Sequence, residues 1–295
     1  MNKVEASVVI CTRNRSIDLE KCLSSIVKQT IVNFEFIIVD SSDKEEQEKV
    51  KLVIDRVKNK VPLSYVHTKP GLTYQRNVGI KKAAGKLLYF FDDDVILENS
   101  YLESMQQVFR NNSEYGGGMG AITNIRMPNG IFWRFLRRFF FLSRSYSKGF
   151  FTLSGMPTHT YGTQVFKDVQ VLGGCCMAFR KELLQKNKFD EKLVGYGYME
   201  DCDISWRVAK ESKLFFNPAA RLQHNSSPPV CDKKAGRCAM FMKHYRYLYF
   251  KNIYVKNKLT YLAYLWSIAG LFIYSFLLRD WQSVKGYYQG LKQSV

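Results

Sequence analysis

Three consecutive aspartates form the first group of side chains that could do chemistry. Asp92, Asp93 and Asp94 directly follow the apolar run Leu87–Phe91, so their carboxylates gather where a buried strand ends. Hard divalent cations such as Mg²⁺ and Mn²⁺ prefer oxygen ligands of this kind. If the extended geometry continues, Asp92 and Asp94 point to one side and Asp93 turns away. The triplet predicts a cation site, and its alternative is a solvated acidic turn that caps a helix near Asn99.

A second acidic cluster, Glu200-Asp201-Cys202-Asp203, opens a helix expected over Asp201–Ser212. One of its carboxylates could act as a general base that removes the proton of a hydroxyl nucleophile. Negative charge at a helix N-terminus is also favoured by the helix dipole. Taken alone, the cluster therefore fits catalysis and helix capping equally well.

Weaker single signals come from three further polar residues. Asp40 ends the apolar run Phe34–Val39, and Arg76 and Asn77 open a helical segment. Asp40 could accept a hydrogen bond from a nucleobase or ribose, and Arg76 could bind a phosphate in a bidentate manner. The alternatives are turn capping and a surface ion pair, which contributes about 0–1 kcal/mol.

The elements that must position these groups alternate along the first hundred residues. Short β-like runs are separated by helical periodicity, with Ser16 as the expected N-cap of the first helix. This pattern predicts an α/β fold with an open, mostly parallel sheet, and such sheets bind ligands beyond the carboxyl ends of their strands. The expected strands are Ser7–Cys11, Phe34–Val39, Leu63–His67 and Leu87–Phe91.

After about residue 115 the pattern is looser. Gly116–Gly118 is predicted to be a loop and Met119–Ile125 a strand. A further strand, or a pair broken by Gly173-Gly174, is expected within Val165–Arg180. Leu214–Phe216 is predicted to be another strand, with His224 just beyond it.

Together these segments resemble the family 2 glycosyltransferases, inverting enzymes with the GT-A fold. The resemblance covers roughly residues 5–225, about three quarters of the chain, and implies a nucleotide-diphosphate sugar donor and a divalent metal cofactor, Mn²⁺ or Mg²⁺. The segments that carry it are SVVICTRNR (7–15), FEFIIVDSSD (34–43), GLTYQRNVGIKKAAGKLLYFFDDDV (71–95), GGCCMAFRKE (173–182) and FDEKLVGYGYMEDCDISWR (189–207).

The resemblance also implies roles for individual residues, position by position. Asp201 matches the catalytic base, with Glu200 and Asp203 as close competitors. Asp94 and Asp92 match the metal-binding ends of the DxD motif, and His224 is either a metal or phosphate contact or a loop histidine. Residues on the side of the donor sugar or acceptor are Gly173, Gly174 and Trp206. Those implied in nucleotide-sugar binding are Thr12, Arg13, Asn14, Asp40, Arg76, Asn77, Asp92 and Asp93.

Two departures from the family pattern bear on specificity. Ser41 stands where many relatives have a second acid after Asp40, which leaves the nucleotide's identity open. The QxxRW signature of processive synthases is absent, because Ser205-Trp206-Arg207 lacks its upstream glutamine. We therefore expect transfer of one sugar rather than polymerisation.

Charge is unevenly distributed along the 295 residues. The chain has 44 Lys and Arg against 26 Asp and Glu, a formal charge of +18, yet residues 1–110 carry only +2. Residues 115–167 and 233–258 supply +15 of the total.

Ile131–Arg144 interleaves six aromatic residues with four arginines, a composition suited to a headgroup layer or to a buried helix flanked by surface arginines. Leu259–Leu278 has no charge over twenty residues and could span, re-enter or lie on a membrane.

These features predict a GT-A catalytic domain over residues 1–230, with a nucleotide-sugar half (1–115) and an acceptor half (116–230). Residues 231–295 are expected to form a membrane-associated helical region. Basic sequence before the apolar stretch, seven cysteines without a metal-site spacing and the lack of a signal peptide favour the cytoplasmic face of the membrane. A lipid-linked glycan acceptor of surface polysaccharide synthesis fits this location.

Two other classes of function stay open at this point. A metal-dependent nucleotidyltransferase would share the α/β sheet and the acidic site. A non-enzymatic, basic nucleic-acid-binding protein would explain the charge, but the sequence holds no nucleic-acid-binding motif, so no nucleic acid partner is expected. Nothing in the sequence indicates an oligomeric state.

Overall fold

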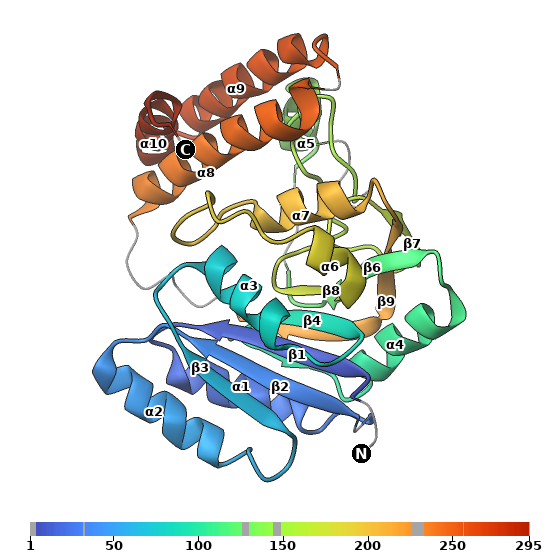
Figure 1. The fold of residues 1–295 in the computed structure, drawn as a ribbon. Coiled ribbons are helices and arrows are strands. Elements are labelled where there is room, and N and C mark those ends of the chain that lie inside the picture. Colours follow the sequence, from blue (N-terminus) through green and yellow to red (C-terminus); the bar gives the residue numbers. More distant parts are fainter. Residues whose placement is uncertain are drawn as a thin grey trace. The chain divides into compact units, whose positions relative to one another are not determined.

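The computed structural model describes residues 4–31, 33–125, 130–143, 149–225, 233–255 and 257–294. The chain forms two compact units, one of residues 1–125 and 162–228 and one of residues 126–161 and 229–295 (Figure 1). The second unit thus joins an internal segment to the C-terminal part, whereas the boundaries expected from the sequence keep 116–230 together. Arg144, the last residue of the aromatic and arginine-rich stretch, lies outside the described residues.

The first unit is built on a nine-stranded sheet whose order is β3-β2-β1-β4-β8-β6-β9-β5, with β7 paired to β9. The four strands from β3 to β4 are parallel, and β8 runs antiparallel to both β4 and β6. The strands are β1 (Ala6–Thr12), β2 (Phe34–Asp40), β3 (Leu63–His67), β4 (Leu87–Asp92), β5 (Val95–Leu97), β6 (Tyr115–Ile122), β7 (Lys167–Val169), β8 (Cys176–Arg180) and β9 (Lys213–His224).

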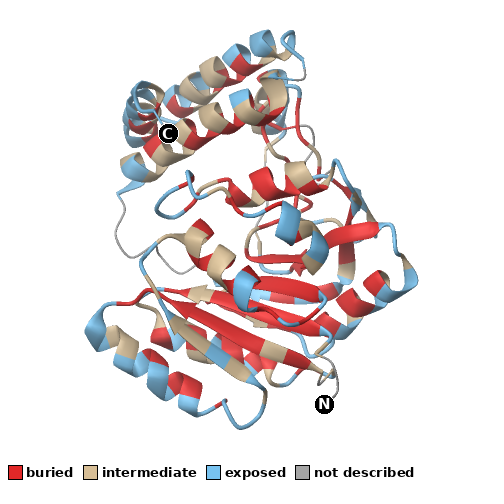
Figure 2. Ribbon diagram, viewed as in Figure 1, coloured by how far each residue is buried: buried red, intermediate tan, exposed pale blue. Residues whose placement is uncertain are grey.

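Helices flank this sheet on both faces. Figure 1 shows α3 in front of the sheet and α1 behind it, and Figure 2 shows that the central strands between them are buried. The helices of the first unit are α1 (Ser16–Ile26), α2 (Lys44–Asp55), α3 (Leu72–Lys82), α4 (Tyr101–Asn111), α6 (Lys181–Lys186) and α7 (Glu200–Val208). The predicted α/β class and the first four strands are confirmed. The mostly apolar runs β1, β2 and β4 are buried on both faces, whereas β3 is a partly exposed strand at the end of the sheet.

The order of the parallel strands determines where a ligand can enter. From β1 the chain adds β2 and β3 on one side, then returns to place β4 on the other side of β1. The loops after β1 and β4 therefore leave the sheet at the point where its winding direction switches. Such a switch point opens a crevice at the carboxyl ends of the strands, and the three aspartates follow β4 there.

The prediction of a loop at Gly116–Gly118 is wrong. These glycines lie inside β6, which is buried along its whole length. A β-carbon on Gly118 would lie 2.4 Å from the ring of Phe215, and one on Gly117 would lie 2.6 Å from Phe179. The glycines are strand residues because aromatic side chains of β8 and β9 fill the space that their own side chains would need.

Replacing Gly118 with alanine should therefore destabilise the protein by about 1–3 kcal/mol, the usual cost of overpacking a core. Gly173→Ala is the matched control, because its β-carbon would meet only the mobile end of Met119 at 3.3 Å. The measurement is the free energy of unfolding in denaturant. Equal losses in the two variants would contradict this account of β6.

Helix starts differ from the predictions in two places. Ser16 is not the N-cap of α1, since that position is Arg15 and no side chain caps the helix. The Ser16 hydroxyl instead donates to Glu46 of α2 at 2.6 Å. Helix α3 begins at Leu72, four residues before Arg76, directly after Gly71, which has a φ of 143°.

The second unit is helical. Helix α10 packs closely on α8, since a β-carbon on Gly286 or Gly290 would lie 2.3 Å from a backbone oxygen of Ala235 or Ala239. Among the described residues, α9 is long and apolar enough to cross a membrane by length and composition. The helices are α5 (Ile131–Phe139), α8 (Lys234–Leu248), the π-helix η1 (Tyr249–Tyr254), α9 (Thr260–Leu277) and α10 (Trp281–Lys292).

Candidate active site

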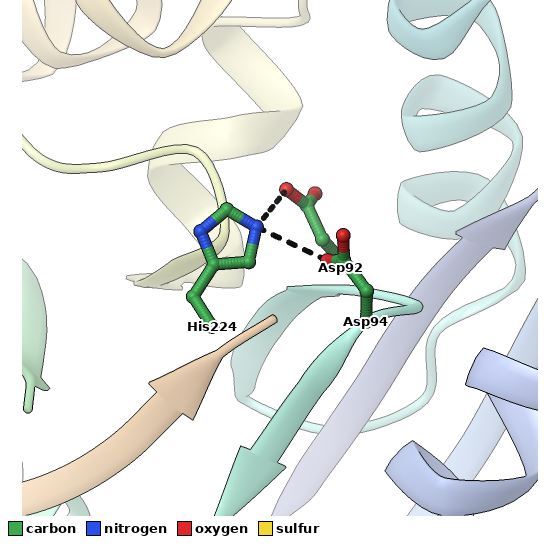
Figure 3. Close-up of side chains that lie close together, drawn as sticks. All are labelled: Asp92, Asp94 and His224. Carbon is green, nitrogen blue, oxygen red and sulfur yellow. Dashed lines mark ion pairs between the residues drawn. The ribbon is translucent and has the colours of Figure 1, made fainter. Parts of the chain in front are cut away.

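Two aspartates and a histidine meet at the carboxyl end of β4 (Figure 3). Nε2 of His224 lies 3.1 Å from Oδ1 of Asp94 and 4.0 Å from Oδ2 of Asp92. One ligand atom from each residue lies within 4.8 Å of the others. The pairing of β5 with β9 sets His224 opposite Val95, directly beside Asp94. Two carboxylates and one imidazole form a donor set that fits a divalent cation such as Mn²⁺.

The protonation of His224 depends on these carboxylates. Burial disfavours the charged imidazolium, but the hydrogen bond to Asp94 and the charges of Asp94 and Asp92 outweigh burial and raise the pKa of His224. Burial also raises the pKa of Asp92, although the Arg76 guanidinium opposes this effect. The cluster thus concentrates negative charge that a bound cation would neutralise.

Asp93 turns away from this cluster, although Asp93 and Asp94 lie in a turn after β4 rather than in a continued strand. Its carboxylate accepts a hydrogen bond from Thr12 Oγ1 at 2.7 Å and pairs with Arg15 Nη1 at 3.1 Å. Arg15 also lies 3.5 Å from Asp94. Burial raises the pKa of Asp93 to about 7, against the opposing effects of Arg15 and Thr12. Asp93 therefore fixes the loop after β1 to the loop after β4.

Arg76 links the two acidic clusters. Its guanidinium pairs with Glu200, lies 3.2 Å from Oδ1 of Asp92 and donates to the carbonyl oxygen of Gly174 at 2.8 Å. The ring of Phe189 lies 5.4 Å from the guanidinium carbon. Arg76 is only 2% exposed. One buried cation thus holds the end of β4, the loop before β8 and the start of α7 together.

The three acids of the second cluster have different surroundings. Glu200 is buried and paired with Arg76, and Asp203 is buried and accepts from Arg207 at 2.8 Å. Asp201 is only partly buried. Its Oδ2 accepts from the Gly174 backbone N–H at 2.9 Å, and its Oδ1 accepts from the N–H of Cys202 at 2.8 Å.

Burial raises the pKa of Glu200 above its ordinary range, and the nearby Asp201 charge adds to this effect while Arg76 opposes it. The two neighbours of Asp201 in this cluster thus pair with arginines, whereas the Asp201 carboxylate accepts hydrogen bonds from two backbone N–H groups. Such bonds orient a carboxylate without neutralising its charge.

The glycine loop before β8 contacts this cluster directly. A β-carbon on Gly174 would lie 2.8 Å from Oε1 of Glu200 and 3.4 Å from Oδ2 of Asp201. Gly173 lies against Met119 of β6. Trp206 of α7 is partly buried, with the Lys210 ammonium 5.3 Å from its ring centroid.

The other residues implied in nucleotide binding are placed in different ways. Asp40 is fully buried, and its oxygens accept from Ser42 N at 2.8 Å and Tyr65 Oη at 2.9 Å. Arg13 is exposed, and Asn14, with a φ of 54°, binds Asp43 through its amide. Asp40 thus ends β2 and holds the start of the following loop through Ser42.

Asn77 bonds the segment that contains Phe189 and Glu191. Its amide donates to the carbonyl of Phe189 at 2.9 Å and to Glu191 at 2.8 Å, and its oxygen accepts from Phe189 N at 2.9 Å. Asn77 thus fixes the segment whose Phe189 ring contacts Arg76.

Two residues that hold the site together were not predicted from the sequence, Arg15 and Gln75. Arg15 pairs with Asp93, and the Gln75 amide donates to the carbonyl oxygens of Thr12 and Val39.

A sheet of this order, with carboxylates at the end of its central strand, defines a class of α/β proteins with the GT-A fold. Solved structures support this class. A mannosyltransferase from Pyrobaculum calidifontis, solved with GDP-Man and Mn²⁺, superposes with a TM-score of 0.62 over 98% of this chain and 87% of its own, at 16% identity.

The chain belongs to Glycosyl transferase family 2, whose family model matches residues 7–187. The match includes the residues after β1, β2 and β4, and it ends before the Glu200–Asp203 cluster and His224. Among curated relatives, Glycosyltransferase GlyA of Streptococcus pneumoniae is 24% identical over 65% of this chain and 27% of its own length.

A second relative is the GalNAc(5)-diNAcBac-PP-undecaprenol beta-1,3-glucosyltransferase of Campylobacter jejuni. It is 25% identical over 73% of this chain and 63% of its own length. The chain therefore spans about a quarter to just under two thirds of the length of these relatives.

Proposed function

We propose that this protein is an inverting glycosyltransferase that moves one sugar from a nucleotide-diphosphate sugar to a hydroxyl group of a glycan or lipid-linked glycan. The observation that carries the proposal is the Asp92–Asp94–His224 cluster, which Arg76 connects to the acids of α7. Membership of Glycosyl transferase family 2 supports the reaction class.

Asp201 is the proposed base. Its carboxylate is oriented by two backbone N–H groups and stays partly exposed, whereas Glu200 and Asp203 are buried in arginine pairs. A general base must reach the acceptor's proton and must be free to take it. These surroundings favour Asp201 over its neighbours.

In the proposed reaction, the acceptor oxygen attacks the anomeric carbon while Asp201 takes its proton. The bond from the anomeric carbon to the diphosphate oxygen breaks, and the nucleoside diphosphate leaves from the opposite face, which inverts the configuration. A divalent cation held by Asp92, Asp94 and His224 would supply charge neutralisation at the diphosphate. Arg76 positions Asp92 and Glu200, because its guanidinium already bonds both carboxylates.

The proposed acceptor and location rest on a different part of the chain. The C-terminal helix α9 is apolar, and the curated relative from C. jejuni carries undecaprenol in its name. We place the protein at the cytoplasmic face of an anionic membrane, where cytosolic nucleotide sugars meet a lipid-linked acceptor. Surface polysaccharide synthesis is the process that fits.

The test is a screen of nucleotide sugars with the full chain. The expected result is release of nucleoside diphosphate with one or a few donors, its loss with EDTA, and its return with Mn²⁺ or Mg²⁺. Bound donor should also raise the melting temperature, since ligands that bind the native state stabilise it. Release of inorganic diphosphate instead would identify a nucleotidyltransferase and overturn the proposal.

Replacing Asp94 with alanine should weaken metal-dependent donor binding by at least about 10- to 100-fold, because a ligand and much of the site's charge are lost. The control is Asp55→Ala, which removes an exposed carboxylate on α2. Donor affinity is measured by calorimetry with and without Mn²⁺. Unchanged affinity in the Asp94 variant would show that the cation site lies elsewhere.

A further inference from the structure

The second unit carries most of the protein's charge surplus. Residues 126–161 and 229–295 contain 17 Lys and Arg but only two Asp and Glu, a formal charge of +15. Such a surplus attracts anionic surfaces. The same unit also holds α5 and α9, which expose several large apolar side chains.

Helix α5 has no buried residue. Phe132, Phe135 and Phe139 recur at i, i+3 and i+7 on one side, and each is more than half exposed. Arg134 and Arg137 lie on the other side, and Arg138 lies at its edge, one turn after Phe135. Aromatic residues on one face and arginines on the other are typical of a helix that lies in a membrane interface.

Helix α9 buries its small and polar residues and exposes its large apolar ones. Its buried residues are Tyr264, Ser267, Gly270 and Ser275. Its exposed apolar residues recur at spacings of three, four and seven and so form one stripe along the helix. They are Leu262, Leu265, Trp266, Ile273, Phe276 and Leu277.

The buried face of α9 is already occupied within the unit. The hydroxyls of Ser267 and Tyr245 lie 2.8 Å apart, and the Tyr264 ring stacks on Tyr249 with centroids 4.0 Å apart. Gly270 lies directly against Phe140. A single helix crossing a bilayer meets lipid on all sides, whereas α9 can offer lipid only its exposed stripe.

The apolar faces of α5 and α9 are continuous. Trp266 donates from its ring nitrogen to the Phe139 carbonyl at 2.8 Å, and their rings lie 5.3 Å apart. Phe135 stacks on Phe139 in turn. Trp133 of α5 also contacts Tyr274 of α9. The two helices therefore present one surface, which we call the α5–α9 face.

Charged groups lie on the helices that pack around α9. Lys234 of α8 pairs with Asp280 at 2.6 Å, and Arg246 donates to the Leu291 carbonyl of α10. If α9 spanned the bilayer, these groups would enter the hydrocarbon with it, where charged side chains are costly. With α9 parallel to the membrane they stay in water or among headgroups.

We propose that the α5–α9 face docks the second unit onto an anionic lipid bilayer, with α9 lying in the plane of the membrane rather than across it. The occupant is lipid, because the face is apolar and aromatic while the unit around it is strongly basic. This proposal builds on the proposed membrane location and adds which surface binds the membrane and how α9 is oriented. It does not depend on sugar transfer.

The first experiment measures co-sedimentation of the full chain with vesicles. Binding is expected to vesicles of phosphatidylcholine with phosphatidylglycerol, with weaker binding to phosphatidylcholine alone and a decline as salt rises. The double variant Phe135→Gln/Leu262→Gln should bind about tenfold more weakly or worse, since apolar contact with lipid is lost. Wild-type binding to neither vesicle, or equal binding by the variant, would overturn the proposal.

Leu52→Gln is the matched control, because Leu52 is an apolar residue that is 60% exposed on α2 of the first unit. It should bind vesicles as the wild type does. An unchanged melting temperature in all variants shows that they fold. If the face instead packs against a second copy of the chain, sedimentation will show a dimer that does not bind vesicles. The double variant will then be a monomer, and this result refutes lipid as the occupant.

The second experiment measures how deeply individual indole rings enter the bilayer, from the quenching of their fluorescence. Two triple variants keep one indole each: Trp133→Phe and Trp206→Phe are combined with Trp281→Phe to keep Trp266, or with Trp266→Phe to keep Trp281. Both are bound to vesicles containing lipids brominated at different chain positions. An in-plane helix places both indoles at a similar shallow depth. A spanning helix would place Trp266 near the bilayer centre and Trp281 at its surface, and that result would overturn the in-plane orientation. Donor turnover, measured without vesicles, tests the proposed activity separately.

Discussion

Asp201→Asn should abolish sugar transfer while leaving donor binding nearly unchanged. The asparagine keeps the shape of the side chain and can still accept from the N–H of Gly174, but it cannot take the acceptor's proton. General base catalysis contributes about 10²- to 10⁴-fold, so the turnover number should fall by about this factor. The measurement is steady-state transfer with the donor found in the screen, together with donor affinity.

Two companion variants identify the base within the cluster. Asp203→Asn changes a carboxylate two positions away that is paired with Arg207, so it should lower stability more than turnover. Glu200→Gln distinguishes the remaining competitor. If Glu200→Gln eliminated transfer and Asp201→Asn did not, Glu200 would be the base and Asp201 its neighbour.

Arg76→Met should be the most destabilising change in the first unit. Removing the guanidinium leaves Glu200 and Asp92 close together without their shared cation, and breaking a buried pair in this way costs about 3–5 kcal/mol. The free energy of unfolding is measured in denaturant. Arg56→Met provides the comparison, because Arg56 pairs with Glu20 at the surface, where a pair contributes about 0–1 kcal/mol.

The same variant should show a characteristic pH dependence. Burial raises the pKa of Glu200 in the folded protein, so the folded state holds that proton more tightly than the unfolded state does. Stability then falls as pH rises from the unfolded pKa toward the folded one. Without Arg76 the carboxyl loses a cation that favours its charged form, so its folded pKa rises further and the decline should extend to higher pH. A pH-independent difference from the wild type would contradict the assigned role of Arg76.

Sequence patterns predicted the parallel half of the sheet because β1, β2 and β4 are mostly apolar runs followed by polar residues, while β3 is shorter and partly exposed. They also predicted that Asp92 and Asp94 would face the same side. They could not show that His224 joins them, since this depends on the register of β9 against β5. Nor could they show the pairing of Arg76 with Glu200, 124 residues away.

Other errors followed from reading local signals without their neighbours. Three consecutive glycines normally indicate a loop, but here Phe179 and Phe215 fill the space beside them and make them strand residues. The sequence also could not show that Tyr65 on the adjacent strand donates a hydrogen bond to Asp40; the role of Asp40 in nucleotide binding stays a prediction. The stretch around α9 has no charge, so the sequence left its orientation open; the burial of Tyr264, Ser267, Gly270 and Ser275 distinguishes its two faces.

The α5–α9 face also affects how the chain is made. Its two helices are more than a hundred residues apart in sequence, and synthesis delivers α5 first. Until α9 emerges, the aromatic side of α5 has neither Trp266 nor Tyr274 to pack against, while β7, β8 and β9 are still being added to the sheet. The second unit is thus the last to be completed. Binding of α5 to a lipid surface would shield its aromatic side chains from water until α9 is made.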